Sequence, residues 1–291
     1  MTIKNAAQTS KLCILSYNSK GLAPEKQEFC KLFTSKAIIG DKLPILCNQE
    51  NFVLHGNSYK INQTFPDFHC IIKPAIKDTH DKGRAKNGMF IAIPETLKSC
   101  VNDVSPAFWR IQAVTIKSAS SILLSINSYF PNDPRTANFD DEALIETFDN
   151  IKRVIDSNEF DLLCLCGDIN ADFSRNTGFV NTVQQEVDDL GLSLAWNTHE
   201  IDFTFAYNDA QDISHVAVLD HFFWNSLAES AIHDAGVLHI PENTSDHSPI
   251  FCTIDIDFII IDRAHKHVDR VTAKPSWKKA TDDEKIDFTR I

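Results

Sequence analysis

The chain has 291 residues, of which 43% are hydrophobic and 23% are charged, proportions that are ordinary for a globular protein and exclude a disordered or fibrous chain. No apolar stretch approaches the roughly 18 residues of a membrane helix, and the N-terminus lacks a signal-peptide pattern, so we expect an intracellular protein, nuclear or cytoplasmic, without membrane contact. Because the formal net charge is −12, any binding of nucleic acid must depend on a local surface.

Three stretches with apolar residues at helical spacing predict helices over residues 24–37, 140–158 and 179–190, the last ended by Gly191. They alternate with short runs rich in Ile, Leu, Val and Phe. This alternation predicts one layered domain of the α/β or α+β class.

The composition shifts after about residue 257, so we expect a domain over residues 1–257 and a charged linker over residues 258–291. Thr281 and Glu284 have the spacing of a capping box, which indicates that a further helix begins there. We therefore expect the chain to be a fragment of a longer protein.

The cysteines show no CxxC pair, and most lie inside apolar runs. Free, buried thiols in a reducing compartment are therefore predicted, and a structural zinc site is not. A polar stretch with four basic residues could lie along a phosphate backbone or could be a solvated loop, and the sequence leaves both alternatives open. The four residues are Lys77, Lys82, Arg84 and Lys86.

Six apolar runs carry polar side chains of catalytic type at or near their ends. These side chains are Asn18, Glu50, Tyr129, Asp168 with Asn170, Asp220, and Asp246 with His247. Each case alone is common turn chemistry, but the six together predict a shared site if the run ends meet at one edge. Such a group of carboxylates requires a hard cation, and Mg²⁺, with Mn²⁺ as an alternative, fits the oxygen donors better than zinc does.

Two segments are the most informative. In Gly167–Asn170 the two-residue spacing of Asp168 and Asn170 predicts side chains on one face, and Gly167 would let the backbone approach a ligand closely. Ser245, Asp246 and His247 are expected in a turn before the last apolar run.

The ordered segments SYNSKGL, NQENF, SINSYFPND, CGDIN, DFTF, VLDHFFW and TSDHSPI resemble the endonuclease/exonuclease/phosphatase superfamily, which has the DNase I-like fold. Within it, the sequence is most similar to the apurinic-like endonuclease domain of LINE-type non-LTR retrotransposons. The resemblance implies an α+β fold, a four-layer sandwich of two β-sheets flanked by helices. It also implies DNA as the partner and a reverse transcriptase that follows or associates with the domain.

The resemblance further implies a role for each matching residue. Glu50 would be the main metal ligand with support from Asn18, and Asp246 would complete the acidic cluster, with room for a second metal. Asp168 would deprotonate the attacking water, aided by Asn170, and Asp220 would orient His247 toward the scissile phosphate. Tyr129 would donate to a phosphate oxygen, with Thr204 and Ser245 as further phosphate contacts. Lys20 departs from the pattern, since repair-type relatives carry an acid there.

The sequence therefore predicts a Mg²⁺-dependent endonuclease that nicks DNA for target-primed reverse transcription. Two alternatives stay open: a phosphodiesterase of the same fold that acts on RNA or a small phosphodiester, and an inactive retroelement fragment.

Overall fold

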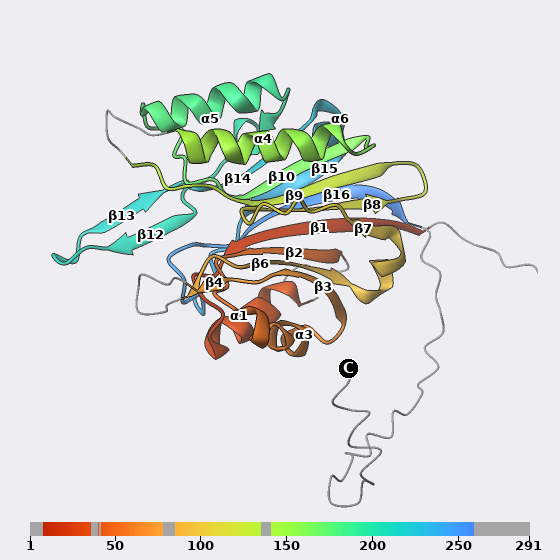
Figure 1. The fold of residues 1–291 in the computed structure, drawn as a ribbon, viewed down its shortest axis with the longest axis horizontal. Coiled ribbons are helices and arrows are strands. Elements are labelled where there is room, and N and C mark those ends of the chain that lie inside the picture. Colours follow the sequence, from red (N-terminus) through yellow and green to blue (C-terminus); the bar gives the residue numbers. More distant parts are fainter. Residues whose placement is uncertain (1–7, 36–39, 41, 78–84, 135–140, 259–291) are drawn as a thin grey trace, which may run out of the picture. The chain divides into compact units, whose positions relative to one another are not determined.

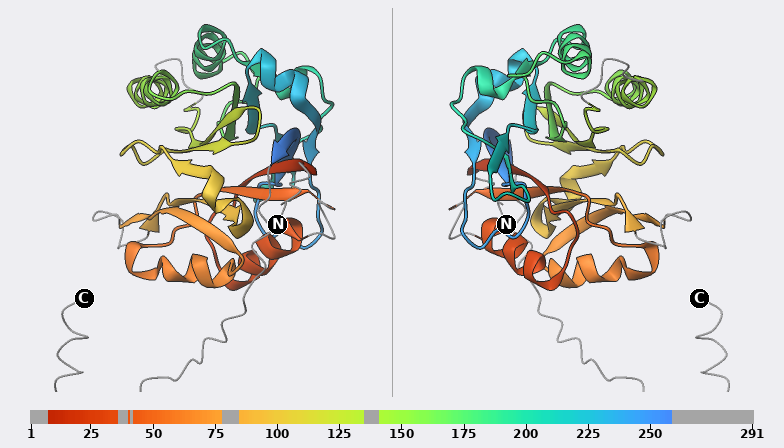
Figure 2. Two further views of the ribbon diagram at one scale, coloured as in Figure 1. Left: turned by 90° about the vertical axis from the view of Figure 1, so that its right-hand side faces the viewer. Right: turned by 90° about the vertical axis from the view of Figure 1, so that its left-hand side faces the viewer.

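Two six-stranded β-sheets face each other and carry helices on their outer sides (Figures 1 and 2). The structure is a computed structural model that describes residues 8–35, 40, 42–77, 85–134 and 141–258. All of these belong to the first of the chain's two units, Met1–Ile260. The predicted α+β sandwich of four layers is confirmed.

The first sheet contains the N-terminal strand and the last described strand side by side. Its order is β15 (Ile232–Val237), β16 (Ile250–Phe258), β1 (Gln8–Asn18), β2 (Leu43–Gln49), β6 (Met89–Pro94) and β3 (Phe68–Lys73). Strands β1 and β2 are parallel, and the other neighbours are antiparallel. Two helices, α1 (Pro24–Thr34) and α3 (Tyr59–Thr64), bury Phe29, Phe33 and Ile61 against its outer face.

The second sheet also has six strands, of which one neighbouring pair is parallel and the others are antiparallel. Its order is β11 (Ser193–Leu194), β14 (Asp220–Trp224), β10 (Leu162–Asp168), β9 (Ile122–Tyr129), β8 (Ile111–Lys117) and β7 (Val101–Asp103). Strands β9 and β10 are parallel, and α4 (Glu142–Asp156) and α5 (Gly178–Asp189) cover the outer face.

Short elements complete the described structure. They are the hairpins β4–β5 (Ile76–Lys77, Ala85–Lys86) and β12–β13 (Phe205–Asn208, Ser214–Ala217), the helix α6 (Ser226–Ala231), and the 3-10 turns η1 (His55–Asn57), η2 (Glu95–Cys100) and η3 (Ala195–Asn197). Figure 1 shows the β12–β13 hairpin extending away from the two sheets. None of the helices in the described ranges has the length and apolar character that crossing a membrane requires.

The main core lies between the two sheets and includes four of the predicted buried thiols, Cys47, Cys164, Cys166 and Cys252. All eight cysteines are free, as predicted, and only Cys70 and Cys100 are partly exposed.

At one end of this core, polar side chains of the two sheets are hydrogen-bonded to each other. Gln49 of β2 donates from Nε2 to Asn127 Oδ1 of β9 at 2.6 Å, and both side chains are fully buried. Since a buried amide that loses its partner is costly, this bond fixes the two sheets relative to each other where β2 and β9 end.

The three predicted helices are present, with small differences at their ends. The helix expected over residues 24–37 ends at Thr34, and residues 36–39 lie outside the described ranges. The other two run from Glu142 to Asp156 and from Gly178 to Asp189. Gly191 ends the third as expected, since it adopts φ +65° and its N–H donates to Asp188 O.

The apolar run that contains Asp220, residues 216–224, is divided between two sheets. Strand β13 ends at Ala217, and β14 begins at Asp220. The division arises because Thr204 Oγ1 accepts hydrogen bonds from the backbone N–H groups of Leu219 and Asp220, at 2.9 and 3.0 Å. Asp220 therefore begins a strand instead of lying within one.

Candidate active site

Strand ends from both sheets meet at one end of the sandwich. The parallel strands β1 and β2 end there at Asn18 and before Glu50, and β9 and β10 end there at Tyr129 and Asp168. Strands β14 and β16 run antiparallel to β10 and β1, so they begin at this same end. In the second sheet Tyr129, Asp168 and Asp220 stand opposite one another in register.

These strand ends surround a cavity of about 560 Å³. Its lining includes the predicted residues Glu50, Tyr129, Asp168, Asn170 and His247. Seven further residues line it: Lys20, Asn132, Asp133, Arg175, Phe205, Tyr207 and Leu219.

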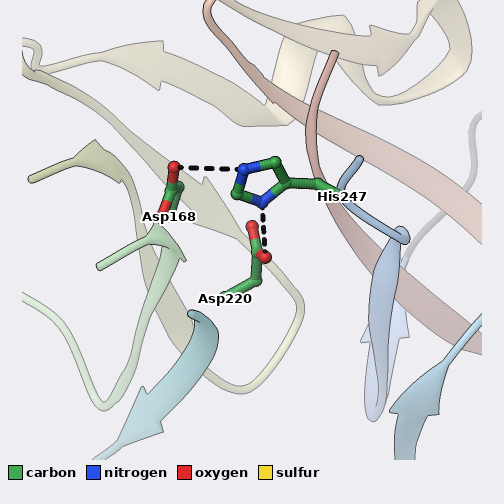
Figure 3. Close-up of side chains that lie close together, drawn as sticks. All are labelled: Asp168, Asp220 and His247. Carbon is green, nitrogen blue, oxygen red and sulfur yellow. Dashed lines mark hydrogen bonds and ion pairs between the residues drawn. The ribbon is translucent and has the colours of Figure 1, made fainter. Parts of the chain in front are cut away.

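His247 lies between two buried aspartates (Figure 3). Its Nδ1 is 2.8 Å from Asp220 Oδ2, and its Nε2 is 3.8 Å from Asp168 Oδ2. The first distance is a hydrogen bond in which the imidazole N–H donates to the carboxylate, whereas the second is too long for one. Asp220 thus orients the ring, and the Nε2 edge stays available for another acceptor at the cavity.

Asn18 connects the two sheets at the cavity. Its Nδ2 donates to Asp168 Oδ2 at 2.8 Å and to Glu50 Oε2 at 2.9 Å. Its Oδ1 accepts the backbone N–H of Lys20 at 3.0 Å. Since the whole amide is engaged within the protein, these contacts favour a role in positioning the two carboxylates over the predicted role as a metal ligand.

The electrostatics of the aspartates and the histidine are coupled. Burial, with the nearby carboxylates of Asp220 and Glu50, raises the pKa of Asp168 to about 7, although the His247 cation opposes this shift. Burial alone would lower the pKa of His247, but Asp220 and Asp168 outweigh it and raise that pKa to about 9. The two aspartates thus favour the protonated form of the His247 ring, and burial favours the protonated form of Asp168.

Tyr129 differs from these groups because it stays protonated. Burial raises its pKa, and the negative charges of Glu50 and Asp168 raise it further. Its phenol is thus a hydrogen-bond donor at the cavity.

Three residues that line the cavity have a strained backbone. Lys20, Glu50 and Asn170 adopt φ values of +46°, +51° and +56°. Left-handed conformations of residues other than glycine are uncommon and concentrate at functional sites. Three of the six described non-glycine residues with positive φ thus line the cavity, and this grouping supports a functional site there.

Asp168 and Asn170 both line the cavity, but strand alternation is not what brings their side chains together. Strand β10 ends at Asp168, so the alternation no longer applies two residues later. Asn170 instead donates from its backbone N–H to Asp168 Oδ1 and from Nδ2 to Phe130 O. Gly167 also acts differently than predicted: a Cβ there would stand 1.8 Å from Ser128 O, so glycine admits the neighbouring strand β9 and not a ligand.

The predicted phosphate contacts of Thr204 and Ser245 find no support in their positions. Thr204 is fully buried and binds the backbone of Leu219 and Asp220. Ser245 Oγ donates to Asn18 O at 2.9 Å. Neither lines the cavity, so both are better placed to hold the turn and the strand that carry His247 and Asp220.

The Asp246 carboxylate, predicted to complete the acidic cluster, forms an ion pair with Lys20 Nζ. The sequence signalled Lys20 only as a departure from the pattern and gave no indication of this pairing.

Sequence reasoning also missed an aromatic and cationic pair beside Tyr129. The Arg110 guanidinium lies 4.0 Å from the centre of the Trp109 ring and donates to Tyr129 O at 3.2 Å. Trp109 packs against the Tyr129 ring, whereas Trp224 is buried in the main core and Trp196 packs against that core. Of the basic loop, Lys77 and Lys86 lie in the β4–β5 hairpin, and the other two residues fall outside the described ranges.

The donor set fits a hard divalent cation. Glu50 and Asp168 come close enough to share one amide, and the remaining cavity donors are carboxylate, amide and phenol oxygens. None of the eight cysteines lines the cavity. One atom each from Asp168, Asp220 and His247 also lies within 4.8 Å of the others, a grouping that could hold a metal ion, but the 2.8 Å hydrogen bond already uses Asp220 and His247.

Comparisons with protein families and with curated proteins found no match. Among solved structures, the endonuclease domain of TRAS1, a telomere-specific non-LTR retrotransposon, is similar over 84% of this chain and 98% of its own, with a TM-score of 0.60 and 16% identity. An AP endonuclease from Leishmania major is similar over 84% of this chain and 88% of its own (TM-score 0.63, 11% identity), and one from Archaeoglobus fulgidus over 84% and 100% (0.62, 14%).

Identities this low establish the fold alone. The chain has the fold of the endonuclease/exonuclease/phosphatase, or DNase I-like, superfamily, as the sequence resemblance implied.

Proposed function

We propose that this chain is a divalent-metal-dependent phosphodiester hydrolase that nicks DNA. The observation that carries the proposal is the convergence of Asp168, His247 and Glu50, from far-separated segments of both sheets, on one cavity, where Asn18 and Asp220 position them. The fold neighbours named as endonucleases support the same chemistry.

Each group has a distinct task in this proposal. Asp168 takes a proton from the attacking water, because its pKa of about 7 suits a base at neutral pH. His247, held by Asp220, donates from Nε2 to an oxygen of the phosphate, and the Tyr129 hydroxyl donates to another.

Glu50 would hold a Mg²⁺ or Mn²⁺ ion, with Asn18 fixing its carboxylate. When bound, the ion would neutralise charge that develops on the phosphate oxygens.

The direct test is nicking of supercoiled plasmid in Mg²⁺ by the purified chain and three isosteric variants, Asp168→Asn, His247→Gln and Glu50→Gln. We expect each to lower the rate by at least about 100-fold, the range of a lost acid, base or metal ligand. Circular dichroism and thermal unfolding verify that each variant is folded.

Matched controls make the same chemical changes at exposed positions outside the cavity lining: Asp67→Asn, His55→Gln and Glu95→Gln. They should nick like the wild type. A folded Asp168→Asn or His247→Gln protein with wild-type activity would refute the assignment.

The substrate could instead be RNA or a small phosphodiester. The net charge of −12 and the carboxylates in the cavity lining favour this second candidate, since a duplex is usually held by a basic surface. Plasmid, single-stranded RNA and bis(p-nitrophenyl) phosphate compared side by side distinguish the candidates. Hydrolysis of none of the three by a folded protein would indicate an inactive fragment.

A role in target-primed reverse transcription is a finer proposal. It is supported by the fold shared with the TRAS1 domain and by the sequence resemblance to LINE-type endonucleases. In this role the nick would leave a 3′-hydroxyl, residues 1–257 would form the endonuclease domain, and residues 258–291 would link it to a reverse transcriptase. Extension of the nicked strand by a polymerase added with a labelled nucleotide tests the end chemistry.

A further inference from the structure

Lys20 brings a positive charge into the cavity at a fixed place. Its side chain is about half exposed, lines the cavity together with Glu50 and Asp168, and forms an ion pair with Asp246. Asp246 has only 17% of its side chain exposed, so its carboxylate is mostly withdrawn from water. The pair is therefore more than a solvated surface contact, the kind that contributes little.

The backbone around Lys20 is built to hold this position. The residue adopts the left-handed conformation, and its N–H donates to Asn18 Oδ1. Lys26 Nζ donates to Lys20 O at 2.9 Å and also binds Ser19 O. On the other side of the pair, Ser245 Oγ donates to Asn18 O, which fixes the turn that carries Asp246.

The charges of the cavity lining limit how many cations it can accept. Glu50 lines the cavity and accepts a hydrogen bond from the uncharged Asn18 amide, whereas the Asp246 carboxylate is already paired with the Lys20 ammonium. A second ion at Asp246 would meet the Lys20 ammonium at close range and would be repelled.

We propose that the Lys20 ammonium occupies, at Asp246, the place where a second divalent cation would bind, so that the site takes one divalent ion, at Glu50. This inference rests on the proposed function. It assigns Lys20 as a residue that determines the metal stoichiometry of the site.

The experiment counts bound Mn²⁺ by electron paramagnetic resonance and calorimetry on the full chain without substrate. We expect one bound ion in the wild type and in Asp246→Asn, with a dissociation constant that changes less than about 3-fold, and two ions in Lys20→Asp. Adding Asp246→Asn to Lys20→Asp should return the number to one. The control Lys98→Asp makes the same charge change at an exposed, remote pair and should keep one ion.

Two results would overturn the inference. One is a second ion in the wild type that Asp246→Asn removes, and the other is a folded Lys20→Asp protein that still binds one ion. If Lys20→Asp does not fold, the comparison of wild type with Asp246→Asn decides, since loss of the single ion in Asp246→Asn contradicts the inference.

Failure of the proposed function gives a different pattern. Retention of the ion in Glu50→Gln, or no Mn²⁺ in the wild type, refutes the proposed metal position. In that event the proposed role of Lys20 is still tested by whether Lys20→Asp binds one more Mn²⁺ ion than the wild type does.

Discussion

His221 is a buried neutral histidine behind the proposed active site, and it should make the stability of the fold depend on pH. It follows Asp220 in β14, is 1% exposed, and lies against the ring of Phe173 at 4.9 Å. Its Nε2–H donates to Ala171 O at 2.7 Å, whereas Nδ1 has no partner among the described residues. A second proton on Nδ1 would therefore find no hydrogen-bond acceptor among the described residues.

The magnitude follows from the shift in pKa. Burial lowers the pKa of His221 from 6.5 to about 4, although the backbone acceptors and the carboxylates of Asp220 and Asp172 oppose the shift. Because the folded pKa lies below the unfolded one, the unfolded state binds the extra proton as the pH falls below 6.5. Stability is thus full above that pH and decreases toward pH 4. The loss from this residue is about 2 kcal/mol between pH 7.5 and pH 5.

The assay is urea unfolding at pH 7.5 and pH 5 for the wild type, His221→Gln and the exposed control His55→Gln. Glutamine keeps one N–H donor but does not titrate, so its free energy of unfolding should fall by about 2 kcal/mol less than that of the wild type over this interval. The control should follow the wild type, because other titrating groups are common to all three proteins. If the three curves run parallel within about 0.5 kcal/mol, the reasoning about His221 is refuted.

Two further predictions concern residues that support the cavity. Gly167→Ala should lower the free energy of unfolding by at least about 3 kcal/mol or prevent folding, because the new Cβ would stand 1.8 Å from the backbone oxygen of Ser128. The control Gly178→Ala, with open space around the new Cβ, should leave thermal unfolding nearly unchanged. Thr204→Val should cost about 1–3 kcal/mol, since it leaves the N–H of Asp220 without its acceptor, and should slow nicking without weakening DNA binding measured in EDTA. Weaker DNA binding with unchanged stability would instead favour the phosphate contact predicted from the sequence.

The fold could be predicted because its signals are local. Apolar spacing defines α4 and α5 to within two residues, and Gly191 marks where α5 ends. The break before Asp220 could not be predicted in the same way. It depends on the Thr204 hydroxyl, which lies 16 residues earlier in the chain, on the far side of the β12–β13 hairpin.

Residue types at strand ends were enough to predict which side chains meet, but their partners required the structure. The approach of Asn18 to Asp168 joins residues 150 positions apart, and the ion pair of Lys20 with Asp246 joins residues 226 positions apart. Nothing in the local pattern around Lys20 distinguishes a lysine that enters the cavity from one that points into solvent. For that reason the sequence predicted that Asp246 completes an acidic cluster, whereas in the structure the Lys20 ammonium neutralises Asp246.

The proposed site depends on the packing between sheets more than on either sheet alone. Glu50 and Asn18 come from the first sheet, whereas Asp168 and Asp220 come from the second, and no strand carries residues of both groups. The distance between the two groups is therefore set by the hydrogen bond of Asn18 to Asp168, by the buried bond of Gln49 to Asn127 and by the core behind them. Protein interiors transmit strain, and catalytic groups must be held to well within about 1 Å of their working positions. Substitutions in that core can therefore reduce activity without touching the cavity. A loss of nicking in a core variant is thus evidence about the active site only when the geometry between the sheets is shown to be intact.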